Sequence, residues 1–271
     1  MKKIKQIAAA AGVVLLLLMY ISTLVFAVQK NEAAQAWFRA SIGCTILVPV
    51  LLYAFFLAAK AVRPSKSPLI DTVIFDVGKV LLDFPWETYA EKLNLSAEAI
   101  SAIQKKIMYS PLWGEFDLNN RPYEDIVNEF CELNPAYRKE IHEVVDTIDR
   151  CIEKYPYTDS WLSDLKRKGY KLYILSNWSE QTYNRLKARG VMDFEEKYMD
   201  GAVWSYRVHA VKPSREIFNL LRDTYHINPE RAVFLDDMEQ NIKAAREYGY
   251  NAIQFSGFED AKQKLSLIGV K

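Results

Sequence analysis

The stretch Thr72-Val73-Ile74-Phe75-Asp76-Val77 decides the fold prediction, because it combines a strand composition with a carboxylate at the strand end. Its β-branched and aromatic residues are typical of a strand buried on both faces of a parallel sheet. Asp76 stands at the carboxyl end of that strand, where open parallel sheets bind their ligands. Taken alone, an aspartate after a strand is more often a turn former or a helix cap. The rest of the chain must therefore decide its role.

Downstream of residue 158, strand and helix patterns alternate. The strand patterns cover 171–175, 202–204, 232–235 and 252–255, and the helix patterns cover 159–168, 180–188, 214–225 and 240–248. Gly169, Gly190 and Gly249 follow three of these helices, as is common at helix ends. Such alternation predicts βαβ units and a parallel sheet. The fold class is therefore α/β, with a Rossmann-like parallel sheet.

Between the first strand and this alternating part lies a long helical block. From about residue 86 to 154, apolar residues recur at three- and four-residue spacing, and Pro122 and Pro135 suit helix starts. The block is too large for one crossover, so we predict an inserted helical cap over 84–157. Trp113, Phe116 and Arg121 are candidate pocket residues of this cap, with packing inside the cap as the alternative.

The N-terminal part differs in composition. Two stretches without charged residues, 7–28 and 42–59, approach the ~20 apolar residues that cross a bilayer as a helix. A cleaved signal peptide is the alternative for the first stretch, although signal peptides have shorter apolar cores. The sequence thus predicts a two-helix membrane anchor over 1–62 and a proline-containing linker over 63–68. One larger domain would follow over 69–271.

Basic residues flank the two apolar stretches: Lys2, Lys3 and Lys5 precede the first, and Lys60, Arg63 and Lys66 follow the second. Since positive charge stays on the cytoplasmic side, both ends of this hairpin are predicted to be cytoplasmic. The expected location is therefore the membrane, as a multi-pass protein, with the domain over 69–271 in the cytoplasm.

Composition excludes several other classes. The chain has 35 basic and 34 acidic residues, a formal net charge of +1, which gives no footprint for nucleic acid. Its three cysteines are irregularly spaced and suit reduced thiols better than a disulfide framework. The three histidines lack zinc-ligand spacing. Nothing in the sequence indicates an oligomeric state.

Polar residues follow four predicted strands, and parallel strands bring such ends to one edge of the sheet. The four motifs are Ile74-Phe75-Asp76-Val77-Gly78, Ile174-Leu175-Ser176-Asn177, Val211-Lys212-Pro213 and Val233-Phe234-Leu235-Asp236-Asp237, the last followed by Asn241. In this order and spacing, over about residues 72–255, they resemble the haloacid dehalogenase-like hydrolase superfamily, with the helical cap of its first subclass.

The resemblance implies a phosphatase. Asp76 would attack phosphorus to form an aspartyl-phosphate. Mg²⁺ would be the cofactor, held by Asp76, the Gly78 carbonyl and Asp237, with Asp236 bound directly or through a neighbour. Asn241 would orient a metal-bound water or Asp237. For the adjacent Asp236 and Asp237, a solvated turn is the alternative.

The remaining motif residues would bind the substrate. The resemblance implies that Lys212 neutralises the transferring phosphoryl group and steadies Asp76. Ser176 and the backbone around Asn177 would hydrogen-bond phosphate oxygens. Each has an ordinary alternative when taken singly: Ser176 as a helix cap, and Lys212 or Asn241 as a surface residue.

One position departs from the family pattern. Most phosphatases of this family carry a second aspartate where this chain has Gly78, and general acid catalysis is typically worth about 10²–10⁴-fold. A branch resembling bacterial glucose-1-phosphatases shares this Asp-x-Gly pattern. The predicted function is therefore a membrane-anchored, Mg²⁺-dependent phosphatase acting on a small phosphate monoester, with a sugar phosphate as a candidate. A good leaving group, as in a sugar 1-phosphate, would need less protonation.

Two other functions stay open. A degenerate enzyme would bind phosphorylated ligands, or act as a scaffold, without turnover. A 2-haloacid dehalogenase also lacks the second aspartate, but those enzymes work without metal and would not need both Asp236 and Asp237. Asp83 is a candidate substitute acid, with a turn residue as the favoured alternative. Lys79 is either solvent-facing or a second phosphate contact, and Trp178 either walls the site or packs.

Overall fold

The computed structural model describes residues 69–271 and, among the first 68 residues, 18, 20–28, 35–39, 41–43, 47–51 and 53–54. The chain divides into two compact units, 1–67 and 68–271. In the first unit the described residues are helical, and the rings of Phe26 and Trp37 stack with centroids 6.5 Å apart.

The membrane location predicted from the sequence is wrong. No helix within the described residues has both the length and the apolar character needed to cross a bilayer. A helix that crosses a bilayer needs about 20 consecutive, predominantly apolar residues. Other parts of the predicted spans 7–28 and 42–59 lie outside the described residues.

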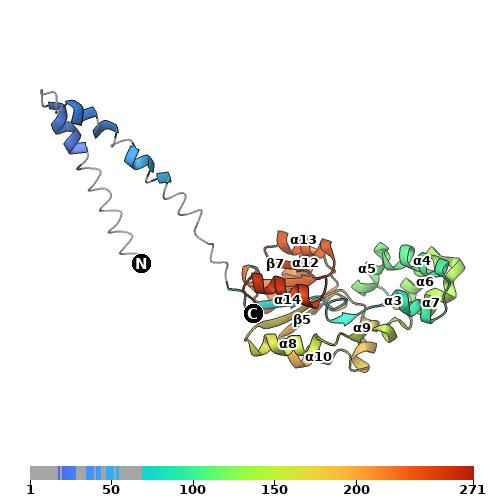
Figure 1. The fold of residues 1–271 in the computed structure, drawn as a ribbon. Coiled ribbons are helices and arrows are strands. Elements are labelled where there is room, and N and C mark those ends of the chain that lie inside the picture. Colours follow the sequence, from blue (N-terminus) through green and yellow to red (C-terminus); the bar gives the residue numbers. More distant parts are fainter. Residues whose placement is uncertain are drawn as a thin grey trace. The chain divides into compact units, whose positions relative to one another are not determined.

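The second unit is built on a five-stranded sheet with the order β5-β4-β1-β6-β7 (Figure 1). All neighbouring strands are parallel, which confirms the predicted α/β class. The strands are β1 (Thr72–Phe75), β4 (Lys171–Ser176), β5 (Gly201–Trp204), β6 (Ala232–Asp236) and β7 (Asn251–Gln254). The central strand β1 pairs with β4 and β6, so that the residues following these three strands come to one edge.

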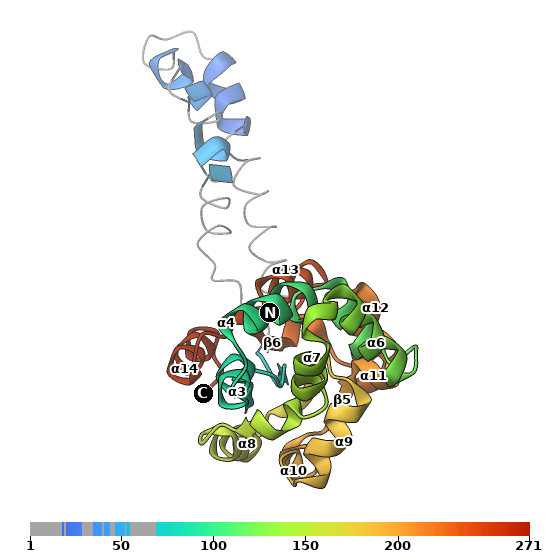
Figure 2. The ribbon, with the colours of Figure 1, turned by 90° about the vertical axis from the view of Figure 1, so that its right-hand side faces the viewer.

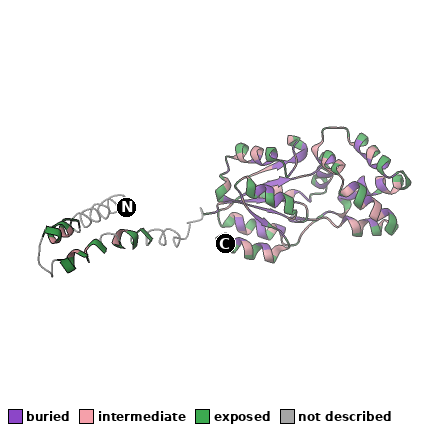
Figure 3. Cartoon of the chain, turned by 90° about the horizontal axis from the view of Figure 1, so that it is seen from above, coloured by how far each residue is buried: buried purple, intermediate pink, exposed green. Residues whose placement is uncertain are grey.

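Helices cover both faces of this sheet. Successive side chains of a strand point to opposite faces, and β1 follows this rule: Phe75 joins one apolar cluster and Ile74 the other. The buried strands therefore lie between outer helices (Figure 3). The helices are α8 (Thr158–Arg167), α9 (Glu180–Ala188), α10 (Asp193–Tyr198), α11 (Ser205–Val208), α12 (Arg215–Tyr225), α13 (Glu239–Glu247) and α14 (Phe258–Leu267), with a 3₁₀ turn at Pro229–Arg231.

A group of helices is inserted after β1. Its stem is an antiparallel pair of short strands, β2 (Leu82–Asp83) and β3 (Glu153–Lys154). Between them lie α3 (Trp86–Lys92), α4 (Ala97–Ile103), a π-helical turn (Gln104–Met108), α5 (Pro111–Leu118), α6 (Tyr123–Leu133), a 3₁₀ turn (Pro135–Tyr137), α7 (Arg138–Val145) and a second 3₁₀ turn (Ile148–Cys151). Figure 2 looks at the unit from the side of these helices.

The inserted helices have an apolar cluster of their own, separate from the two that flank the sheet. Trp86, Phe130 and Ile107 are fully buried in it. At roughly 25 cal/mol per Å² of buried apolar surface, side chains of this size stabilise the folded state by about 1.5–3 kcal/mol each. The insertion thus has its own hydrophobic core.

Candidate active site

Asp76 follows the central strand and lies where three elements meet. Its backbone N–H donates to the Leu235 carbonyl of β6 at 2.8 Å. Its carboxylate accepts a hydrogen bond from the Ser176 hydroxyl at 2.6 Å and lies 2.7 Å from the Lys212 ammonium. Residues 100 positions apart in sequence are thereby in direct contact. Asp76, Ser176 and Lys212 form one hydrogen-bonded group.

Lys212 bridges two buried carboxylates. Its ammonium lies 2.7 Å from Asp76 and 2.6 Å from Asp236, and its side chain is only 2% exposed. Burial by itself would lower the pKa of Lys212, but the charges of Asp236 and Asp76 outweigh it and raise that pKa. The lysine therefore carries its charge throughout the neutral range. A fixed cation is thus held beside the candidate nucleophile.

Asp236 is held by three neighbours, and its lone pairs are largely taken. Besides Lys212, the Met238 backbone N–H donates to it at 2.8 Å, and the Asn241 amide donates to both carboxylate oxygens at 3.0 Å. Asn241 can reach both oxygens of Asp236 because α13 begins at Glu239, shortly after β6 ends at Asp236. Asp236 is therefore better placed to position Lys212 and Asn241 than to supply a free ligand.

Three carboxylates converge at this edge of the sheet. One oxygen from each of Asp76, Asp236 and Asp237 lies within 4.8 Å of the others. Burial raises the pKa of Asp76 to about 7. The Lys212 charge opposes this rise, and the Asp236 and Asp237 charges add to it. Burial and the Asp236 charge likewise raise the pKa of Asp237. Like charges held this close favour a bound cation.

The donor set at this edge of the sheet suits a divalent ion. Mg²⁺ prefers carboxylate, carbonyl and water oxygens, and Asp76 and Asp237 offer carboxylates at the same point. The Asn241 side-chain oxygen is buried and has no hydrogen-bond partner within the described part of the chain. Such an acceptor suits a metal-bound water, because buried polar atoms are otherwise hydrogen-bonded. The residues present therefore fit the ion.

The Asn177 side chain holds the backbone of Lys212. The Lys212 N–H donates to the Asn177 side-chain oxygen at 2.9 Å, and the Asn177 amide donates back to the Lys212 carbonyl at 3.2 Å. The amide side chain is thereby engaged with the chain of the neighbouring loop. What remains for a ligand at this position is the backbone of Asn177.

This reciprocal pair gives a stability prediction. Asn177→Ala leaves the backbone N–H and carbonyl of Lys212 without their partner, and an unsatisfied buried polar group costs about 1–3 kcal/mol. We expect a loss of that size in the free energy of unfolding, measured by urea titration. Asn184→Ala, on the exposed side of α9, is the control and should change it by less than about 0.5 kcal/mol. Equal losses in both variants would contradict the positioning role.

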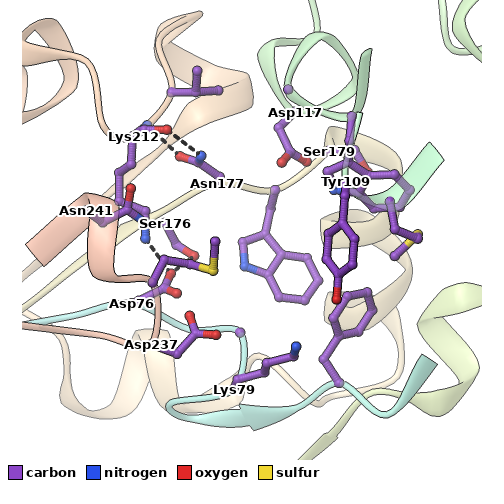
Figure 4. A pocket seen from close by; sticks show the side chains of 18 of the residues that line it. Asp76, Lys79, Tyr109, Asp117, Ser176, Asn177, Ser179, Lys212, Asp237 and Asn241 are labelled. Atoms are coloured by element: carbon purple, nitrogen blue, oxygen red, sulfur yellow. Dashed lines mark hydrogen bonds and ion pairs between the residues drawn. The ribbon is translucent and has the colours of Figure 1, made fainter. Parts of the chain in front are cut away.

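A cavity of about 570 Å³ opens over these residues, between the strand ends and the inserted helices (Figure 4). Gly78 lies at its floor beside Trp178, where an added Cβ would sit 3.8 Å from the indole. That is ordinary contact, so space does not force the glycine. Lys79 lines the cavity in a left-handed backbone conformation, with φ of 58°.

The other candidates from the sequence divide between the cavity and packing. Trp113 and Trp178 line the cavity. Phe116 packs in the core of the inserted helices, and Arg121 pairs with Glu129 at 3.0 Å. Asp83 is not among the lining residues; it accepts a hydrogen bond from the Tyr155 hydroxyl at 3.1 Å.

Among the polar residues of the cavity that sequence reasoning missed, Asp117 is the carboxylate. It lies on α5, is 7% exposed and lines the cavity from the side of the inserted helices. A signal was present in the sequence: Trp113, Gly114 and Asp117 have the spacing of one helix face, and a carboxylate on a buried face is unusual. Without the docking of α5, that face could not be assigned to the site.

A parallel sheet with a buried carboxylate, a buried lysine and paired aspartates at its strand ends, under a helical insertion, is typical of one class of hydrolases. A sequence model described as haloacid dehalogenase-like hydrolase matches residues 70–249. The chain belongs to this family, and the prediction of a hydrolytic enzyme of the family is confirmed.

Individual relatives agree with this. The phosphorylated carbohydrates phosphatase of Thermotoga maritima is 24% identical over 189 residues, covering 68% of this chain and 84% of that protein. The D-ribitol-5-phosphate phosphatase of Bacteroides thetaiotaomicron is 29% identical over 109 residues, covering 38% of this chain and 51% of that protein. The chain spans about a fifth (19%) of the length of the mouse bifunctional epoxide hydrolase 2 that it also matches.

The fold has solved counterparts. A family enzyme from Bacteroides thetaiotaomicron superposes with a TM-score of 0.57 at 20% identity, covering 72% of this chain and 98% of that one. Another structure of that enzyme is a complex with magnesium and inorganic phosphate. At this identity the likeness shows the fold alone.

Proposed function

We propose that this chain is a Mg²⁺-dependent phosphatase that hydrolyses a small phosphate monoester through an aspartyl-phosphate on Asp76. The observation that carries the proposal is the contact of the Asp76 carboxylate with the Lys212 ammonium at 2.7 Å and the Ser176 hydroxyl at 2.6 Å. These groups supply a nucleophile together with a cation and a donor for phosphate oxygens. All three line one cavity.

Each residue has a role in this reaction. Asp76 attacks phosphorus, and the leaving oxygen departs on the opposite side, away from the sheet. Lys212 and Ser176 hold the phosphoryl oxygens and offset the charge that meets an anionic nucleophile. Asp76, the Gly78 carbonyl and Asp237 would hold Mg²⁺, with Asp236 and Asn241 behind them. When bound, the ion supplies positive charge that a carboxylate nucleophile needs to approach a phosphate.

The substrate class is proposed from the cavity and the relatives. Two relatives are phosphatases of phosphorylated carbohydrates and of D-ribitol 5-phosphate. The cavity of about 570 Å³ falls in the ordinary range for small-molecule sites, ~300–1,000 Å³. We propose a phosphorylated sugar or polyol as substrate, 69–271 as the hydrolase domain and 84–157 as its cap.

One observation favours a second function. Gly78 stands where the family's second aspartate would be, so a chain that binds phosphate monoesters without turnover is the competing proposal. A binding protein of this kind would use the same contacts to phosphate as the phosphatase and would lack only the general acid. Turnover is therefore the property that separates the two.

Phosphate release by the full chain tests the proposal. With p-nitrophenyl phosphate and Mg²⁺ we expect turnover, which EDTA should lower by at least about 10²-fold and added Mg²⁺ should restore. Turnover unchanged by EDTA would contradict the metal dependence. No turnover with Mg²⁺, combined with binding of inorganic phosphate in calorimetry, would favour the phosphate-binding alternative.

A further inference from the structure

We propose that Asp117, on the cap helix α5, is the general acid and base of this enzyme and takes the place of the carboxyl that Gly78 lacks. The proposal rests on the proposed phosphatase function. It assigns to a residue of the cap the proton transfers that the chain's own nucleophile loop has no side chain to perform.

The position of Asp117 fits this role. Of the described residues that line the cavity, the carboxylates are Asp76, Asp117 and Asp237. Asp76 and Asp237 lie together at the strand ends, whereas Asp117 projects into the cavity from the cap (Figure 4). The leaving oxygen of an in-line displacement lies opposite the attacking Asp76 oxygen, and hence on the cap side. Asp117 is the carboxylate on that side.

The carboxyl is free to act on a ligand. Asp117 is 7% exposed, and among the described residues its carboxylate has no hydrogen-bonding partner. Its main chain, by contrast, is fixed: the Ser205 hydroxyl donates to the Asp117 carbonyl at 2.8 Å and accepts from the Trp178 N–H at 2.9 Å. Through Ser205, which is fully buried, the cap helix is held against the loop that follows Ser176.

The next residue of the chain, Leu118, adds a second attachment of α5. A ring nitrogen of His209 lies 2.9 Å from the Leu118 carbonyl, so the end of α5 is joined to the core at two successive residues. A side chain anchored in this way keeps a defined direction, which proton transfer requires. By contrast Asp83, the substitute acid considered from the sequence, is paired with Tyr155 outside the cavity lining.

The electrostatic surroundings agree with a proton donor. Burial, offset in part by the Lys212 charge and reinforced by the Asp76 charge, raises the pKa of Asp117 to about 8. A carboxylic acid with such a pKa carries its proton near neutrality, where an ordinary aspartate has lost it. A protonated acid opposite the nucleophile is what departure of the leaving oxygen needs.

The reaction has two half-reactions, in which Asp117 first donates a proton and then accepts one. An Asp76 oxygen forms a bond to phosphorus, the bond from phosphorus to the leaving oxygen breaks, and that oxygen takes the electron pair and the Asp117 proton. The products are an alcohol, the aspartyl-phosphate and the Asp117 carboxylate. Asp117 then accepts a proton from the water that attacks phosphorus. The Asp76–phosphorus bond breaks, inorganic phosphate leaves, and both carboxyl groups return to their starting states.

The test compares two leaving groups in the full-length Asp117→Asn variant. β-Glycerophosphate has a poor leaving group that needs the proton, so we expect its kcat/KM to fall by about 10²–10⁴-fold. p-Nitrophenyl phosphate has a good leaving group, which departs with little need for a proton. Its kcat/KM should therefore fall by less than about tenfold. Glu115→Gln, an exposed position of the same helix, is the matched control and should leave both rates unchanged.

Each outcome decides the matter. A loss of equal size for both substrates, or no loss for β-glycerophosphate, would overturn the role of Asp117. If the wild-type chain hydrolyses neither substrate, the phosphatase proposal fails, and this inference fails with it. Asp117→Glu, which retains a carboxyl, should recover part of the β-glycerophosphate rate. If Asp117→Asn does not fold, the same two-substrate comparison in Asp117→Glu decides, with a selective loss for β-glycerophosphate expected and equal losses contradicting the role.

Discussion

Asp76→Asn is expected to lower kcat for phosphate monoester hydrolysis by at least about 10⁴-fold, the scale seen when a catalytic nucleophile is removed. The amide is close in shape to the carboxylate and can still accept a hydrogen bond from Ser176, so the site should remain folded. It cannot form the acyl-phosphate, and it lacks the charge that pairs with Lys212. Steady-state phosphate release with p-nitrophenyl phosphate measures the effect.

The same chain offers a control for this experiment. Asp83 also follows the first strand, but it is paired with Tyr155 at 3.1 Å and lies outside the cavity lining. Asp83→Asn should leave kcat within about twofold of wild type, because the half-buried side chain lies outside the cavity lining and an amide can still accept the Tyr155 hydrogen bond. Retained activity in Asp76→Asn would remove the nucleophile assignment, whatever the result for Asp83.

Lys212→Met should lose both activity and stability. Removing the ammonium leaves Asp76 and Asp236 as neighbouring buried carboxylates without their cation. Breaking a buried ion pair in this way costs about 3–5 kcal/mol, and urea unfolding measures it. The wild-type lysine has a raised pKa, so its contribution is present below its ordinary pKa and is lost only at strongly alkaline pH.

The variant is expected to lose stability in a lower pH range than the one in which the contribution of the lysine disappears. Burial raises the pKa of Asp76, and the Lys212 charge opposes this rise. Without the lysine the protonated form of Asp76 is favoured further, so that Lys212→Met should become less stable as pH rises through the acidic and neutral range. Lys79→Met is the comparison, since Lys79 lines the same cavity but is exposed, and it should change stability by less than about 1 kcal/mol. A similar small loss for Lys212→Met would show that the buried pair is not required.

Much of the sheet and its helices was predictable because their signals are local. The pattern 180–188 matches α9 residue for residue, since Ser179 caps the helix by accepting from the Thr182 N–H. β6 extends one residue beyond the predicted 232–235. Short elements were missed: α11 has four residues, too few to show a helical period.

The candidate site was predictable to the extent that it follows from topology. Parallel strands must bring their carboxyl ends together, and Asp76, Ser176, Lys212 and Asp236 are indeed joined by hydrogen bonds and ion pairs. Asp117 was not predictable, because its place depends on how the inserted helices dock. A helix period shows which residues share a face but not what that face meets.

The separate apolar core of the inserted helices has an evolutionary consequence. Two short strands, β2 and β3, tie this insertion to the sheet, and the insertion's apolar cluster shares no fully buried residue with the two clusters beside the sheet. Substitutions inside the inserted helices can therefore reshape their side of the cavity while the residues at the strand ends keep their geometry. The choice of ligand can thereby change without any change in the residues at the strand ends.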